Sequence, residues 1–126
     1  MSYERIGVIG AMDSELAALI AALAQPARET VQGLAFHTGR LGAREVVLVR
    51  CGIGKVSAAR CTQVLIDRFA PGAVINTGIA GGLGAGLAVG DIVVADGLVQ
   101  HDFDAAPIGF VRGCLCMGDP GTPTVF

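Results

Sequence analysis

Three short segments hold the residues whose types and spacing could support chemistry. They are residues 10–15 (GAMDSE), 51–55 (CGIGK) and 76–82 (NTGIAGG), and each follows an apolar run. In open α/β sheets, ligands bind beyond the carboxyl ends of the strands. Glycine-rich backbone beside the carboxylate of Glu15 therefore predicts a site for a small molecule. Asp13 and Glu15 together would repel a phosphate group from this site.

The glycines do not match the two common nucleotide-binding patterns. A dinucleotide site needs a Gly-x-Gly-x-x-Gly run that leads from a strand into a helix. Counted from Gly10, the second and third glycine positions of that run hold Met12 and Glu15. The Gly54-Lys55 pair is similar to the end of a P-loop, but Val49 stands where its first glycine belongs. We therefore expect no nucleotide cofactor.

Two groups of side chains have the chemistry of metal ligands. Cys114 and Cys116 are too closely spaced for a zinc knuckle, and no second pair of ligands accompanies them. Residues 101–104 (HDFD) are interpreted as a structural turn, because the other histidine, His37, lies far away in the sequence. We expect no metal ion.

The elements that must position these residues alternate between strands and helices. Apolar periodicity and glycine or proline breaks predict a strand over 5–11, a helix from Asp13 to near Gln25, a hairpin over 34–50, a helix over 55–69, and strands over 73–76 and 91–95. The chain from residue 101 onward has a loop-like pattern. This alternation is typical of an α/β domain.

Composition narrows the class of protein further. The chain has 126 residues, of which 52% are hydrophobic, and its net charge of −2 argues against a nucleic-acid surface. It contains no apolar run long enough for a membrane span and no basic signal-peptide region, so we expect a cytoplasmic protein. With only two clear helices, one sheet face would be poorly covered, which predicts that residues 1–126 are the N-terminal part of a larger domain.

Three collinear runs carry a resemblance to a known family. They are IGVIGAMDSEL, EVVLVRCGIGKVSAA and PGAVINTGIAGGL…VGDIVVADGLVQHDFD, within about residues 6–113. These runs resemble the 5′-methylthioadenosine/S-adenosylhomocysteine nucleosidases of the nucleoside phosphorylase/hydrolase superfamily. The resemblance implies a three-layer α/β/α fold with a central mixed sheet. It also implies hydrolysis of the N-glycosidic bond of adenine thionucleosides to adenine and a thioribose, in methionine and purine salvage.

The resemblance assigns roles to individual residues. Glu15 matches the water-activating glutamate, and Met12 and Ile53 match the lining of the ribose and thioether pocket. Ile79 stands where many relatives have a serine that helps to hold the catalytic water. Two further matched groups are the loop under the nucleoside (Ala80, Gly81) and a segment that reaches into the pocket of the partner in a homodimer (Ala105, Ile108, Phe110).

Simpler interpretations remain open for these residues. Glu15 could be a first-turn glutamate favoured by the helix dipole, and Met12 and Ile53 could be ordinary core. Asp13 is expected to be a helix N-cap rather than a catalytic group. The alternatives for function are a futalosine hydrolase or nucleoside phosphorylase, or an incomplete chain that only binds or dimerises. In the family, the ribose-binding glutamate and the adenine-protonating aspartate lie in a C-terminal half, so residues 1–126 alone should not release adenine.

Overall fold

The computed structural model describes residues 4–115 and 120–126. It divides into two compact units, one ending at Gly81 and the other spanning 82–126. No helix among the described residues is long and apolar enough to cross a membrane.

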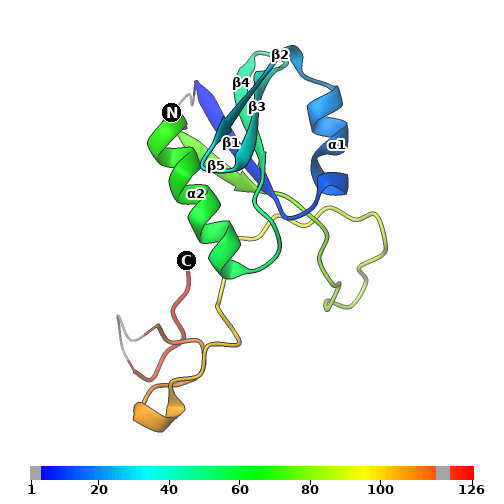
Figure 1. Cartoon of the computed structure of the whole chain (residues 1–126). Coiled ribbons are helices and arrows are strands. Elements are labelled where there is room, and N and C mark those ends of the chain that lie inside the picture. The colour runs from blue at the N-terminus through cyan, green and yellow to red at the C-terminus, as the bar shows by residue number, and fades with distance from the viewer. Residues whose placement is uncertain (1–3, 116–119) are drawn as a thin grey trace. The chain divides into compact units, whose positions relative to one another are not determined.

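The first unit is built on a five-stranded mixed sheet with the order β2-β3-β4-β1-β5 (Figure 1). The strands are β1 (Arg5–Gly10), β2 (Ala24–Val31), β3 (Leu34–Leu41), β4 (Arg44–Arg50) and β5 (Ala73–Asn76). β1 lies between β4 and β5 and is parallel to both, whereas β3 is antiparallel to β2 and β4. The carboxyl ends of β1, β4 and β5 therefore meet at one edge.

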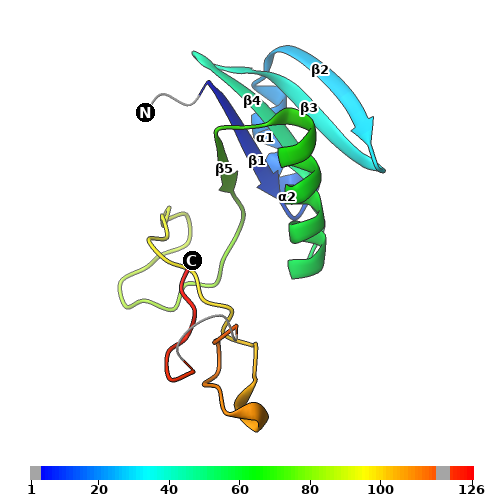
Figure 2. The same ribbon diagram turned by 90° about the vertical axis from the view of Figure 1, so that its left-hand side faces the viewer.

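Two helices pack on opposite faces of this sheet, as Figures 1 and 2 show: α1 (Asp13–Ala21) and α2 (Lys55–Phe69). Alternate residues of the strands face the two helices, since Val46 and Leu48 pack with Leu16 of α1 while Val47 and Val49 pack on the α2 side. This is the expected three-layer α/β/α arrangement. The expectation that one face would be poorly covered is only partly met: each face carries one helix, but Val74 and Ile75 of β5 remain 37% and 50% exposed.

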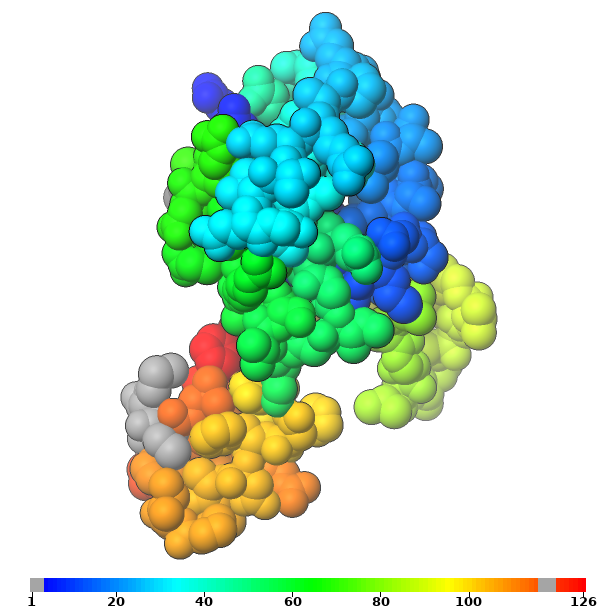
Figure 3. Space-filling view, in the orientation of Figure 1, coloured from blue at the N-terminus to red at the C-terminus, as the bar shows by residue number. Residues whose placement is uncertain are grey.

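Most of the predicted elements are confirmed, and the helix over 55–69 and the strand over 73–76 have the predicted bounds. The helix expected to reach Gln25 ends instead at Ala21, and β2 follows it unpredicted. Pro26 made a strand hard to foresee there. β2 tolerates this proline because it is an outer strand with an irregular register between Ala24 and Ala27. Its residues form part of the surface shown in Figure 3.

The second unit has little regular structure. It contains the 3-10 helix η1 (Ala106–Ile108) and an isolated bridge between Val99 and Val125. The strand expected over 91–95 is not formed, and Ile92 is 91% exposed. The apolar pattern of this segment is that of a strand, but a strand also needs a hydrogen-bonded neighbour, and among the described residues this segment has none.

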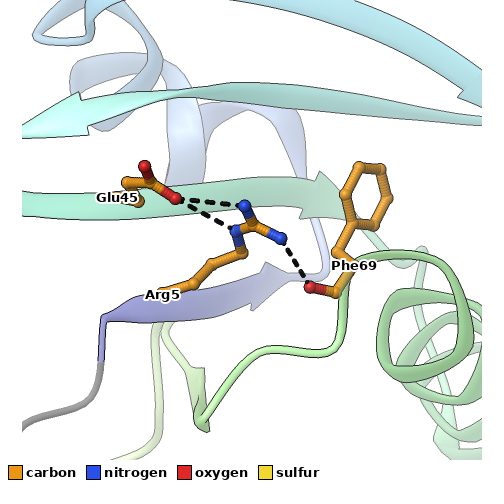
Figure 4. A network of polar contacts seen from close by, with 3 residues as sticks. All are labelled: Arg5, Glu45 and Phe69. Atoms are coloured by element: carbon orange, nitrogen blue, oxygen red, sulfur yellow. Dashed lines mark hydrogen bonds and ion pairs between the residues drawn. The ribbon is translucent and has the colours of Figure 1, made fainter.

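A polar network ties the start of the sheet to the end of α2 (Figure 4). The guanidinium of Arg5 donates to Glu45 Oε2 at 3.1 and 3.3 Å and to the backbone oxygen of Phe69 at 2.9 Å. Ala70 caps the C-terminal end of α2, and its φ of 45° lies in the left-handed region. The network thus fixes the helix end against β1 and β4, although a half-exposed ion pair of this kind contributes only about 0–1 kcal/mol.

Gly7 should be intolerant of a side chain because it lies under α2. A Cβ at this position would lie 2.7 Å from Leu65 Cδ2, and Leu65 is fully buried. We expect Gly7→Ala to lower the free energy of unfolding by about 1–3 kcal/mol through overpacking, measured by urea denaturation. In a double-mutant cycle with Leu65→Ala, the double variant should lose less unfolding free energy than the sum of the losses of the two single variants. Strict additivity would contradict this packing.

Candidate functional site

The turn between β1 and α1 places Glu15 in the first helical turn. Met12 is the N-cap residue, with extended backbone, so the expectation that Asp13 caps the helix was wrong. Asp13 instead forms an exposed ion pair with Arg50 at the end of β4, with 3.1 Å between Oδ1 and Nε. The carboxylate of Glu15 reaches back and accepts the Met12 N–H at Oε2, at 2.9 Å.

The end of β5 provides a second donor to the same carboxylate. The N–H of Ile79 donates to Glu15 Oε1 at 3.1 Å, across 64 residues of sequence. The register of this strand end is set by Thr77, whose N–H donates to Ile9 O at 2.9 Å. Glu15 therefore links the ends of β1 and β5 through one oxygen each.

The carboxyl end of β4 is the third strand end at this edge of the sheet. The N–H of Cys51 donates to Gly10 O at 2.9 Å, which joins β4 to the β1–α1 turn. Burial raises the pKa of the Cys51 thiol, and the negative charge of Glu15 raises it further. Cys51 is therefore held as a neutral thiol beside the carboxylate. Gly52 and Gly54 follow with φ of 83° and 98°, conformations that favour glycine, and lead the chain into α2.

The hydrogen bonds at Glu15 control its ionisation. The Ile79 N–H has the largest effect and the Met12 N–H the next, and together they hold the pKa of Glu15 below its ordinary value of 4.5. Hydrogen bonds donated to a carboxylate stabilise its charged form. Glu15 is therefore an anion at neutral pH and cannot serve there as an acid.

The structure brings together some of the predicted site residues. Met12, Glu15 and Ile79 are joined by the two hydrogen bonds, and the Ile79 side chain is 82% exposed. Ile53 is 77% exposed, which excludes the interpretation of this residue as core within the described chain. Ala80 and Gly81 follow β5 as exposed, irregular backbone.

The three residues expected at a partner subunit lie in the second unit. Ala105 is buried there, at 5% exposure, whereas Phe110 is half-buried and Ile108 is 72% exposed. Of the three, only Ile108 presents a large, mostly exposed apolar side chain. The side chain of Asp104, in the segment expected to be a turn, accepts the Ala106 N–H at 3.0 Å and pairs with Arg112.

Sequence reasoning missed two features of this edge, the Asp13–Arg50 ion pair and the close approach of Gly78 to Glu15. A Cβ built on Gly78 would lie 2.6 Å from Glu15 Oε1. The run NTGIAGG signals a strand-end loop, but only the register of β5 against β1 selects the glycine that faces the carboxylate.

No group of three or more His, Cys, Asp or Glu side chains in the described ranges is arranged to hold a metal ion. Cys114 is buried, and Cys116, which was considered with it, lies outside the described residues.

A cavity of about 470 Å³ occupies another part of the first unit. Its polar lining includes Arg5 with Glu45 and Arg68 with Glu29, which already satisfy one another as ion pairs. Glu15 does not line it. Because its charges are paired internally, this cavity is a poorer candidate for chemistry than the edge at Glu15.

Comparison with known proteins agrees with the fold. The sequence profile of the phosphorylase superfamily matches residues 5–125, and the chain belongs to this superfamily. It is 47% identical over 109 residues to the 5′-methylthioadenosine/S-adenosylhomocysteine nucleosidase of Shewanella putrefaciens, a match that covers 86% of this chain and 47% of the relative. The chain thus spans about half the length of the curated relatives it matches.

Solved structures extend the similarity to three dimensions. The nucleosidase of Colwellia psychrerythraea in complex with adenine has a TM-score of 0.88 at 43% identity, covering 94% of this chain and 49% of that one. The S-adenosylhomocysteine nucleosidase of Streptococcus pyogenes in complex with 5-methylthiotubericidin has a TM-score of 0.87 at 41% identity, covering 94% of this chain and 50% of that one. The resemblance drawn from the three sequence runs is confirmed.

The ionisation of Glu15 can be measured directly. We expect its side-chain carboxyl carbon, followed by NMR during a pH titration, to give a pKa below the ordinary 4.5, because two backbone N–H groups stabilise the anion. A pKa at or above 4.5 would show that these hydrogen bonds do not form in solution.

Proposed function

We propose that the protein hydrolyses the N-glycosidic bond of adenine thionucleosides, namely 5′-methylthioadenosine and S-adenosylhomocysteine, to adenine and a thioribose. The observation that carries this proposal is the Glu15 carboxylate, fixed by backbone N–H groups from two strand ends beside the third. The nucleosidase relatives and the adenine-bound neighbour support the same chemistry.

In the proposed reaction, the bond between the ribose C1′ and the adenine nitrogen breaks, and its electron pair leaves with adenine. The ribose becomes a cation like an oxocarbenium ion. A water oxygen then bonds to C1′, its proton passes to Glu15, and adenine takes up a proton from an acid. The resemblance assigns that acid, and the ribose-binding glutamate, to the half of the relatives that this chain does not span.

The environment of Glu15 suits the attack of water on the ribose cation. Oε2 accepts the Met12 N–H and Oε1 the Ile79 N–H, and a carboxylate has about four acceptor sites, which is more than these two bonds use. Because its pKa is lowered, Glu15 is a weak base towards neutral water but is an anion at neutral pH. Its main contributions would be to orient the water and to stabilise the ribose cation, after which the attacking water becomes acidic enough to give up its proton.

Met12, Ile53 and Ile79 would line the ribose and thioether side of the nucleoside, and Ala80 and Gly81 would pass beneath it. Support for Ile53 and Ile79 is the apolar surface that each exposes beside a strand end, and support for Gly81 is the open space around it. We also propose that the protein works in the cytoplasm, which agrees with the free thiols of Cys51, Cys61 and Cys114.

The decisive substitution is Glu15→Gln in the protein as its gene encodes it. Glutamine keeps the size of the side chain but removes the charge and offers one oxygen for two N–H donors. Release of adenine from methylthioadenosine, followed by absorbance, should fall by about 10²–10⁴-fold. Asp13→Asn, in the same helical turn, removes only an exposed ion pair and is the matched control.

Near-normal turnover by Glu15→Gln would refute the role of Glu15. Turnover of the unsubstituted protein that requires inorganic phosphate would instead identify a nucleoside phosphorylase, and turnover of futalosine alone would identify a futalosine hydrolase.

We further propose that the protein forms a homodimer through the segment that contains Ala105, Ile108 and Phe110. The apolar side chain of Ile108 is mostly exposed in the single chain, and a partner subunit would cover it. Two-fold dimers are the commonest oligomers. Light scattering at micromolar concentration should give the mass of two chains, and Ile108→Glu should lower it towards one. Val89→Glu, at another exposed apolar residue of the second unit, should leave the mass unchanged. A monomer before any substitution would contradict the proposal.

A further inference from the structure

The geometry points to Gly78 as a positioning residue: its lack of a side chain lets the Glu15 carboxylate lie against the end of β5 and receive the Ile79 N–H. A Cβ built on Gly78 would lie 2.6 Å from Glu15 Oε1, 2.9 Å from Cδ and 3.3 Å from Oε2. All three of these nearest atoms belong to the carboxylate. The group thus occupies the space that a methyl group would need.

Backbone strain does not explain this glycine. Gly78 is absent from the described glycines with positive φ, so an alanine could adopt the same backbone conformation. Core packing does not explain it either. A Cβ on Gly7 or Gly10 would meet the buried leucines Leu65 and Leu16, whereas a Cβ on Gly78 would meet an ionisable group, the carboxylate of Glu15.

The carboxylate cannot move away from a methyl group at Gly78 without losing a hydrogen bond. Its Oε2 is held by the Met12 N–H at 2.9 Å on the side of β1. Rotation about this contact would carry Oε1 away from the Ile79 N–H, which now lies at 3.1 Å. Gly78→Ala should therefore leave Glu15 bound to α1 but detach it from β5.

Two consequences follow from this detachment. The first is catalytic and rests on the proposed function: a misplacement of about 1 Å can cost on the order of 10²-fold in rate. The second is independent of activity. The Ile79 N–H is the largest cause of the lowered pKa of Glu15, so its loss raises that pKa towards 4.5. The acidic limb of the kcat/KM profile, where the needed anion is protonated, should then move to higher pH.

The test compares Gly78→Ala with Gly84→Ala, a glycine outside the 76–82 segment whose added Cβ would lie 3.3 Å from the end of the partly exposed Leu87 side chain, which can move aside. We expect Gly78→Ala to lower kcat about 10–100-fold and to shift the acidic limb upward, while Gly84→Ala changes neither. A folded Gly78→Ala variant with unchanged kcat and an unchanged acidic limb would overturn the inference.

Two further measurements separate this inference from the proposed function and from a folding defect. NMR titration of Glu15 should show a higher pKa in Gly78→Ala even if the protein releases no adenine, and an unchanged pKa would overturn the inference. If Gly78→Ala is too unstable to assay, Glu15→Ala should make room for the methyl group. The Gly78→Ala/Glu15→Ala variant should then unfold at the same urea concentration as Glu15→Ala alone. A stability loss that persists in the double variant would mean that the methyl group clashes with other atoms, and it would overturn the inference.

Discussion

The organisation of the candidate site depends on one carboxylate that accepts two backbone hydrogen bonds. Glu15 binds the N–H of Met12 in its own turn and the N–H of Ile79 at the end of β5. The first bond is local, and it needs only that residues 12–15 form the start of a helix. The second exists only when β5 is paired in register with β1. The charge state of Glu15 is thus coupled to the assembly of the sheet.

The sheet order explains why this coupling is possible. β1 is flanked by two parallel neighbours, and helices cover both of its faces, so its carboxyl end is fixed by the core of the first unit. Val8 and Ile9 alternate between the two helix-facing clusters, which sets the rotation of the strand. α1 follows directly, and the side chain of Leu16 fits against the bare Cα of Gly10. Glu15 precedes Leu16, and its direction follows from this packing.

Local patterns predicted the elements with strong periodicity and failed where long-range contacts decide. The helix over 55–69 follows from its apolar face and from the Pro71-Gly72 break behind it. β2 was missed because Pro26 disfavours strands unless the strand lies at an edge, and edge position is a property of the whole sheet. Residues 91–95 have the apolar pattern of a strand but form none, since a strand needs a neighbouring strand to pair with. For the site, the sequence predicted a role for Glu15 but did not predict its contact with Gly78.

The lowered pKa of Glu15 bears on which chemistry the site favours. A carboxylate stabilised by N–H donors is a weaker base, so it removes a proton from neutral water less readily. The same two donors leave its negative charge fixed in place, and a fixed charge stabilises a nearby developing cation without reorganisation. A reaction whose transition state is cationic therefore gains more from this arrangement than one that needs a strong base. Cleavage of an N-glycosidic bond has such a cationic transition state. Attack on a phosphate ester would be hindered, because the carboxylate repels the negative charge of the phosphate.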